Sequence, residues 1–223
     1  MGQSAREEIL GKLKRTERSE VPSRPEMPSL RELSLDREEM VARFTKELIL
    51  QEAVVHRVRN SGEVPEKLNE IADSEGLQWV LVSTDDVIAP LDLPAWGKGR
   101  GITVLTPGDF STRDSFRGAV FDRVQAGITG ADYAVAESGT FVIIHNAQQP
   151  RLASLAPILH IALIPVERMV STYERAIEEI YDAAEDIPSH VTFTTGPSMT
   201  ADIQGKPFKG MHGPRRLIVI LIG

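Results

Sequence analysis

The sequence predicts an α/β fold in which one sheet is covered by helices on both faces. Short apolar runs recur along the chain, and such runs are typical of strands buried on both sides. Between them lie segments whose apolar residues have helical spacing. An apolar fraction of 41% and a length of 223 residues suit one large globular domain.

Residues 1–30 are predicted to form a helical arm and a linker, outside a domain that occupies residues 31–223. Ser4 and Glu7 have the spacing of a capping box, and apolar residues follow them at helical spacing. Three prolines between residues 19 and 29 exclude a helix there, because proline has no N–H to donate. The apolar face of the arm needs a surface to cover it, and a neighbouring subunit of a homo-oligomer is one candidate.

In the first half of the domain, capping residues mark the ends of two predicted helices. Asp36 and Glu39 form a capping box that opens the first helix, and Pro65 opens a second helix that Gly76 closes. The glycine-rich stretch 90–101 is predicted to be a loop. The predicted strands of this half are residues 53–58, 79–82 and 102–105.

In the second half, the apolar runs are clear and the helices are less so. Residues 166–184 are rich in Glu, Arg and Ala and predict a helix. Residues 127–136 are compatible with another helix, and residues 116–124 fit no single pattern. The predicted strands of this half are residues 141–144, 160–165, 191–194 and 217–222.

Composition excludes several classes of function. A formal net charge of -7 argues against nucleic-acid binding, which needs a basic face. The absence of cysteine excludes disulfides, thiol nucleophiles and a resident iron–sulfur cluster. The His and acidic residues lack metal-ligand spacing, so we expect neither a metal nor a cofactor. The sequence has no apolar run of about 18 residues and no signal-peptide core, and we therefore expect a cytoplasmic protein away from the membrane.

The first candidate site motif is a polar turn that leads into the apolar run 141–144. It would present the Glu137 carboxylate and the hydroxyls of Ser138 and Thr140, while Gly139 lets the backbone approach a ligand. With a tuned pKa, the carboxylate would act as a base or nucleophile. The alternative is a turn whose polar side chains only cap backbone groups.

The second motif follows the predicted strand 191–194 and combines hydroxyls with free backbone N–H groups. Such a turn resembles a cradle for an oxyanion or phosphate, in particular where a helix begins. The alternative is a helix cap with an acidic residue in its first turn. The candidate ligand-binding residues of this motif are Thr195, Gly196, Ser198, Thr200 and Asp202.

The third motif brings an imidazole and a guanidinium together near the C-terminus. His212 would perform acid–base chemistry beside Gly213, and Arg215 would bind a carboxylate or phosphate in a bidentate manner. Arg151 is a further candidate anion clamp. The alternatives are a surface hairpin for the third motif and a surface ion pair for Arg151. Since all three motifs lie beside strands, we predict that they converge on one site at an edge of the sheet.

Three segments in this order carry a family resemblance: GITGADYAVAESGTFVI, PRLASLAPILHIALIP and TTGPSMTADIQ with KGMHGPRRLIVILIG. Together they resemble the LUD-domain family, the family of lactate utilization protein C, over roughly residues 36–223. The resemblance implies a NagB/RpiA/CoA-transferase-like fold of three α/β/α layers, with a central, mostly parallel sheet and the helical arm added to it.

The resemblance also implies a role in oxidising L-lactate to pyruvate, beside partner proteins that carry iron–sulfur clusters. This chain would then bind a small carboxylate or related anion. Two alternatives stay open. One is a stand-alone isomerase or acyl-CoA transferase that uses Glu137, the residue that matches the loop glutamate of the wider superfamily. The other is an assembly module that senses a metabolite, so the sequence does not decide whether the chain is an enzyme.

Overall fold

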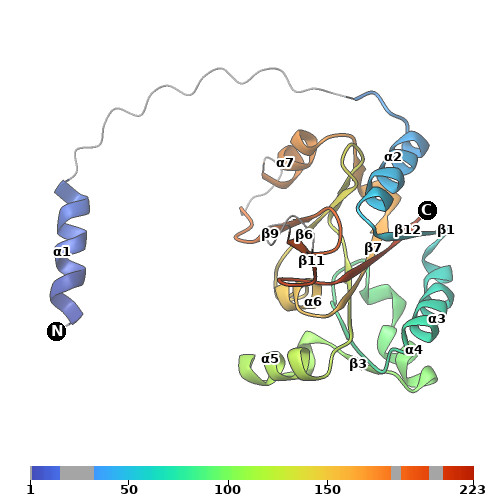
Figure 1. The fold of residues 1–223 in the computed structure, drawn as a ribbon, viewed down its shortest axis with the longest axis horizontal. Coiled ribbons are helices and arrows are strands. Elements are labelled where there is room, and N and C mark those ends of the chain that lie inside the picture. Colours follow the sequence, from blue (N-terminus) through green and yellow to red (C-terminus); the bar gives the residue numbers. More distant parts are fainter. Residues whose placement is uncertain (1, 16–32, 182–186, 201–207) are drawn as a thin grey trace. The chain divides into compact units, whose positions relative to one another are not determined.

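The computed structural model describes residues 2–15, 33–181, 187–200 and 208–223 (Figure 1). The chain forms two units, Met1–Leu30 and Arg31–Gly223. In the first unit, α1 spans Gly2–Arg15, so this helix begins before Ser4 and the predicted cap is wrong. The predicted proline-rich linker lies outside the described residues.

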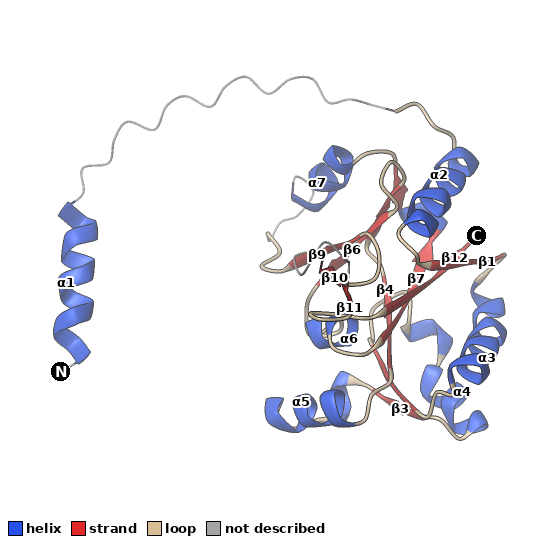
Figure 2. Cartoon of the chain, in the orientation of Figure 1, coloured by secondary structure: helices blue, strands red, loops and turns tan. Residues whose placement is uncertain are grey.

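The second unit is built on a six-stranded sheet in the order β1-β12-β7-β4-β2-β3. Every neighbouring pair of strands in this sheet is parallel. Helices lie on both sides of the sheet (Figure 2), which confirms the predicted α/β fold with a mostly parallel central sheet. The strands are β1 Val54–Val58, β2 Trp79–Val82, β3 Thr103–Leu105, β4 Ala126–Gly130, β7 Leu159–Pro165 and β12 Arg216–Ile222.

A smaller sheet of four strands, in the order β8-β5-β6-β9, packs against one face of the central sheet. The predicted helix over residues 127–136 is wrong, because these residues belong to β4 and β5. Gly127 explains part of the difference, since α6 packs so closely on it that a Cβ would lie 1.7 Å from the Ala153 carbonyl oxygen. The remaining strands are β5 Tyr133–Val135, β6 Thr140–Ile144, β8 Met169–Val170, β9 Val191–Thr194, β10 Met199–Thr200 and β11 Phe208–Lys209.

The helices include one that the sequence did not predict and one that begins late. Residues 93–100 form α4 where a loop was predicted, because Asp92 caps its start and Gly101 its end. In the region predicted as one helix over 166–184, the α-helix begins only at Tyr173, after a short strand. The α-helices are α2 Arg37–Leu50, α3 Val64–Glu75, α4 Leu93–Arg100, α5 Arg113–Asp122, α6 Arg151–Leu155 and α7 Tyr173–Tyr181, and 3-10 turns span Ser61–Glu63, Ala89–Leu91, Pro107–Asp109 and Val166–Arg168.

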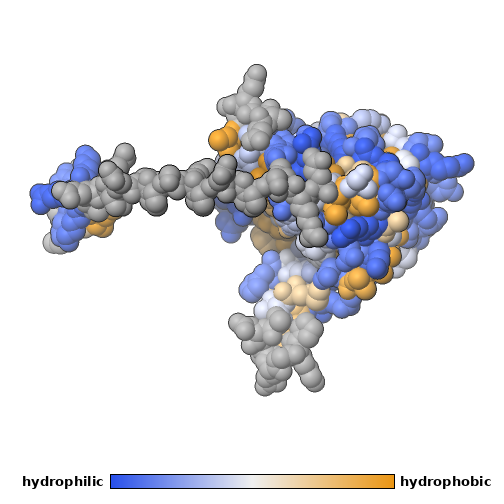
Figure 3. Space-filling model, turned by 90° about the horizontal axis from the view of Figure 1, so that it is seen from above, coloured by the Kyte–Doolittle hydropathy of each residue, from blue (hydrophilic) through white to orange (hydrophobic). Residues whose placement is uncertain are grey.

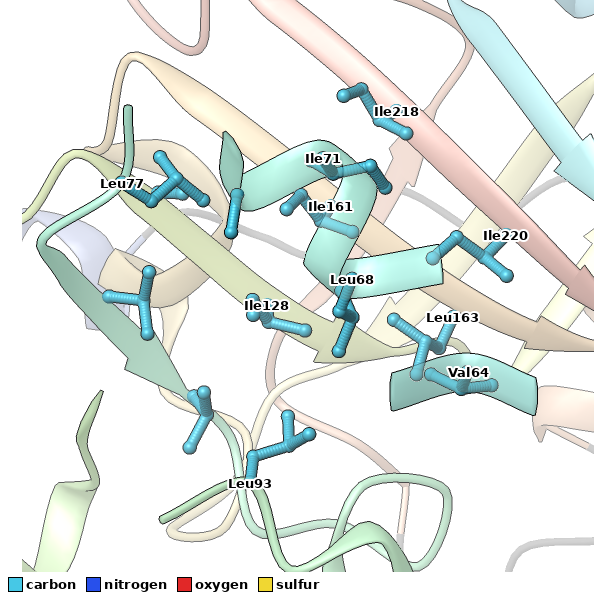
Figure 4. Close-up of a cluster of buried hydrophobic side chains, with 14 of the residues drawn as sticks. Val64, Leu68, Ile71, Leu77, Leu93, Ile128, Ile161, Leu163, Ile218 and Ile220 are labelled. Atoms are coloured by element: carbon cyan, nitrogen blue, oxygen red, sulfur yellow. The ribbon is translucent and has the colours of Figure 1, made fainter. Parts of the chain in front are cut away.

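Alternation along the central strands divides the core between the two faces of the sheet. In β7, Ile161 and Leu163 face α3 and α4 (Figure 4), whereas Ala162 and Ile164 face α2 and the small sheet. A third cluster lies under α5 and α6. The face seen in Figure 3 is mostly hydrophilic, with hydrophobic residues in small groups. Because both faces of the central sheet are covered, a binding site is expected at the ends of its strands and in the connecting loops.

The predicted capping box at the start of α2 is confirmed, and we expect Asp36→Ala to weaken the fold. The Asp36 carboxylate accepts a hydrogen bond of 2.9 Å from the Glu39 N–H, and the Asp36 N–H donates to the Glu39 carboxylate at 2.8 Å. Losing this cap should lower the free energy of unfolding by about 1 kcal/mol, as measured by urea denaturation. Asp36→Ser keeps a capping oxygen and should lose less. Equal losses in the two variants would contradict the prediction.

Candidate functional site

A polar hollow of about 240 Å³ lies where β7 and β12 begin. Its walls come from α6, from β9 and the turn after it, and from the loop before β12. This polar hollow is lined by residues of the second and third sequence motifs together with one buried histidine. Those residues are Thr195, Gly196, Ser198, His212, Gly213 and His160.

A chain of hydroxyl groups connects the first motif to the polar hollow. The Ser138 hydroxyl donates to Thr140 Oγ1 at 2.9 Å, and Thr140 Oγ1 lies 2.8 Å from Thr195 Oγ1. Because Thr140 accepts from Ser138, its own proton is available for Thr195. Either hydroxyl can be the donor in this pair, and where Thr140 donates, the proton of Thr195, which lines the polar hollow, is available to a ligand. Such a chain polarises each successive hydroxyl and strengthens the last donor.

Backbone hydrogen bonds join the second motif to the third. The Ser198 N–H donates to the Pro214 carbonyl at 2.8 Å, and the Gly210 N–H donates to the Ser198 carbonyl at 2.8 Å. The helix considered after the second motif is not formed at Met199–Thr200, because these residues pair with Phe208–Lys209 in an antiparallel ladder. The two motifs therefore form one wall of the polar hollow.

Other predicted site residues lie outside the residues that line the polar hollow. The Glu137 carboxylate accepts a 2.7 Å hydrogen bond from the Tyr173 N–H at the start of α7, which is a capping contact. Gly139 has a φ of 63° and packs against the backbone of α2, where a Cβ would lie 2.6 Å from the Leu48 nitrogen. Thr200 lies in β10.

The two predicted anion clamps also lie apart from the polar hollow. Arg151 is the first residue of α6 and lines a second hollow, not the polar hollow. The Arg215 N–H donates to the Ile158 carbonyl, and its side chain packs over Gly210, where a Cβ would meet it at 1.8 Å. Asp202 lies outside the described residues. The site that the structure assembles therefore depends on hydroxyls and imidazoles.

Sequence reasoning missed the buried histidine at the base of the polar hollow. His160 is 1% exposed, and its Nε2 lies 2.9 Å from Thr129 Oγ1. Burial, with a smaller contribution from His145, lowers the pKa of His160 to about 3, so the ring is neutral at physiological pH. Among the described residues, Nδ1 has no hydrogen-bond partner. It is a polar atom that a ligand in the polar hollow could satisfy.

A second neutral histidine lies behind the wall of the polar hollow. His145 Nδ1 lies 3.2 Å from the Gln149 carbonyl, which can only accept, so Nδ1 carries the proton. Nε2 then accepts from the Thr192 hydroxyl at 2.7 Å, and Thr192 lines the polar hollow. Burial is the main cause that lowers the pKa of His145. This arrangement fixes the tautomer of His145 and uses the Thr192 proton in the hydrogen bond to Nε2.

We expect His160 to make the fold less stable as pH falls below about 6.5. The folded-state pKa of about 3 lies below the ordinary value of 6.5, so in this window the unfolded chain binds a proton that the folded chain does not. The free energy of unfolding should fall by up to about 1.4 kcal/mol per pH unit below pH 6.5. Urea denaturation of the wild type and His160→Asn between pH 7.5 and 5 measures this slope.

Asp132 changes the free energy of unfolding with pH in the direction opposite to His160. Its contribution is the same in the wild type and in His160→Asn, so it cancels when the two slopes are compared. Burial raises its pKa from 3.8 to about 6, so its contribution to stability is lost as pH rises through this range. The slope should therefore be steeper in the wild type than in His160→Asn, in which His145 and His56, whose pKa values are also lowered, still contribute. Identical slopes in the two proteins would contradict the assignment of a buried neutral imidazole.

Within the described parts of the chain, no group of three His, Asp or Glu side chains is placed to hold a metal ion. No helix in those parts is long and apolar enough to cross a membrane. The side chains that line the polar hollow include hydroxyl groups and imidazoles.

Fold and site together define an α/β domain with a parallel central sheet and a hydroxyl-lined hollow where the inner strands β7 and β12 begin. The chain belongs to the LUD domain family, whose sequence profile matches residues 41–222. This membership confirms the resemblance carried by the three sequence segments.

Relatives of this chain include proteins with a named role. Lactate utilization protein C of Anoxybacillus flavithermus is 32% identical over 73% of this chain and 71% of that protein. Lactate utilization protein C of Deinococcus radiodurans is 36% identical over 61% of this chain and 62% of that protein. An uncharacterized protein of Neisseria meningitidis serogroup B is 27% identical over 98% of this chain and 94% of that protein.

The fold is also similar to that of a solved structure. The crystal structure of a DUF162 family protein from Deinococcus radiodurans has a TM-score of 0.61 to this chain at 24% sequence identity. The similarity covers 85% of this chain and 99% of the other. At this level of identity it shows a shared fold.

Proposed function

We propose that this protein is a component of L-lactate utilization and binds a small carboxylate in the polar hollow. The observation that carries the proposal is its similarity to proteins named lactate utilization protein C, at 32% identity over 73% of the chain in one case. The region that matches the LUD domain model, residues 41–222, includes the motifs that line the polar hollow. The reaction it serves would be the oxidation of L-lactate to pyruvate.

The chemistry of the polar hollow supports a ligand that is small and oxygen-rich. The Thr195 hydroxyl, at the end of the hydroxyl chain, would donate to a carboxylate oxygen, and Ser198 and His212 would supply further donors. His160 Nδ1 would bond the hydroxyl or keto oxygen at the other end of a two- or three-carbon acid. No arginine lines the described walls of the polar hollow, so we expect binding in the micromolar to millimolar range.

The redox centres of this reaction would reside in other proteins. The chain contains no cysteine, so it has no thiolate to hold an iron–sulfur cluster. We therefore propose that it acts with iron–sulfur partner proteins and contributes substrate or product binding. The Glu137 carboxylate, which caps α7, offers no support for a stand-alone transferase that would use it as a nucleophile.

Growth on L-lactate tests the proposed role. A strain that lacks its own lactate utilization protein C should grow on L-lactate again when it expresses this chain. Thr195→Val removes the last hydroxyl of the chain and should abolish the rescue, whereas Thr200→Val, in β10, is the matched control. Failure of the wild-type chain to rescue, although it is expressed and folded in that strain, would count against the role.

Calorimetry tests the ligand separately. L-lactate and pyruvate are titrated into the purified chain, with a phosphosugar as the comparison ligand. Thr195→Val should weaken the binding of the small acid at least about tenfold, since it removes one charge-assisted hydrogen bond. The absence of heat from either acid up to 10 mM, on the order of the weakest affinity expected, would exclude the polar hollow as a lactate or pyruvate site.

A further inference from the structure

A second hollow, of about 490 Å³, lies between α5 and α6 and shares one lining residue, Leu155, with the polar hollow. The two helices lie side by side (Figure 1). The arginine hollow, as we name it, is lined from α5 by Arg113, Phe116, Arg117 and Phe121, and from α6 by Arg151 and Leu152. Nothing in the proposed lactate function uses it.

The spacing of the α5 residues places them on one stripe of the helix. Arg113, Arg117 and Phe121 follow each other at intervals of four residues, so their side chains point to the same side. Phe121 is 65% exposed, which is unusual for a phenylalanine in a folded domain. The stripe therefore presents two cations and an aromatic ring to solvent.

The guanidinium groups of the arginine hollow lack the close carboxylate partners that Arg57, Arg100 and Arg168 have. Arg117 has one carboxylate, Asp114, at 3.8 Å, in a pair that is largely exposed. The side chains of Arg113 and Arg151 form no hydrogen bond or ion pair with any described residue. Arg113 is also the first residue of α5, where the helix dipole disfavours a positive charge, so helix stability does not explain it.

Charge and shape favour a protein segment over a small molecule. The described lining contains no acidic residue, although the chain as a whole carries a net charge of -7. An adjoining hollow of about 330 Å³ shares Arg113, Phe116 and Pro150, which extends the groove past the start of α5 to the segment 107–112. Small-molecule sites fix their ligands with buried polar groups, whereas the arginines of this lining are exposed. Exposed arginine and aromatic side chains are typical of protein interfaces.

We propose that the arginine hollow docks an acidic segment of a partner protein. Carboxylates of that segment pair with the guanidinium groups of Arg113, Arg117 and Arg151, and an apolar side chain packs on Phe116 and Phe121. The arginine hollow adjoins the polar hollow at Leu155, which lines both, but the proposal does not depend on lactate binding.

Fluorescence anisotropy of a labelled peptide tests this proposal on the full chain. The probe is a ten-residue peptide of glutamates with one leucine and one phenylalanine, and we expect saturable binding on the order of 10–100 µM at low salt. Arg113→Glu and Arg151→Glu should each weaken binding at least about fivefold, and Phe121→Ser about threefold. The matched control is Arg43→Glu, an exposed arginine of α2, which should change the affinity less than about twofold.

Several results would overturn the proposal. One is the absence of saturation at 1 mM peptide, roughly the weakest useful affinity. Another is a loss of peptide affinity in Arg43→Glu as large as that in Arg113→Glu. A third is equal affinity for a peptide in which lysine replaces glutamate. Sedimentation velocity measures whether the chain forms a dimer. If the wild type is a dimer and Arg113→Glu is a monomer, the occupant of the arginine hollow is a second copy of this chain and not a partner protein. The arginines are exposed, so the variants should melt like the wild type, and circular dichroism checks this.

Discussion

Phe141→Ala should lower the free energy of unfolding by about 3–5 kcal/mol and the melting temperature by roughly 6–20 °C. Phe141 is fully buried in β6, between the small sheet and the central sheet. Its ring also lies 5.7 Å from the His160 ring, so the truncation leaves a cavity beside the polar hollow. Urea denaturation followed by circular dichroism measures the loss.

The matched control for this variant is Phe121→Ala. The Phe121 side chain is 65% exposed, so its removal should change stability by less than about 0.5 kcal/mol. A loss below about 1 kcal/mol for Phe141→Ala would mean that the small sheet does not pack tightly on the central sheet.

Gly127→Ala should destabilise the protein by about 1–3 kcal/mol or more, because the added methyl group has no space. A Cβ at this position would lie 1.7 Å from the Ala153 carbonyl oxygen, so α6 must move away from β4. Since α6 lines both hollows, its displacement should also weaken ligand and peptide binding. Thermal melting together with the two binding assays measures these effects.

Gly99→Ala is the control for the general effect of replacing glycine. Gly99 lies in α4 with open space around its Cα, and alanine there should stabilise the protein by about 0.4–1 kcal/mol. Opposite signs for the two substitutions would confirm that contact with α6, and not backbone freedom, requires glycine at position 127.

Local signals in the sequence were sufficient for most elements of the fold. The apolar runs that became β2, β7 and β12 were recognisable because each is buried on both faces. Residues 127–136 were misread, because the need for Gly127 arises from α6, whose contact lies more than twenty residues away in the chain. The helix α4 was missed because two internal glycines outweighed the caps at Asp92 and Gly101.

The candidate site was only partly predictable for a related reason. Thr195, Ser198 and Gly213 were identified from turn chemistry, and the structure brings them to one hollow. The orientation of Glu137 depends on the Tyr173 N–H, 36 residues away in the sequence, which no local pattern reveals. His160 was missed because it stands in an apolar run, where its contact with Thr129 of the neighbouring strand has no signature.

The pairing of β1 with β12 has a consequence for biosynthesis. β1 is an edge strand whose neighbour in the sheet lies more than 150 residues later in the chain. At roughly 5–20 residues per second, a ribosome needs on the order of ten seconds or more between the two strands. During that interval β1 has no partner strand, so we expect chaperones to engage the nascent segment until translation delivers β12.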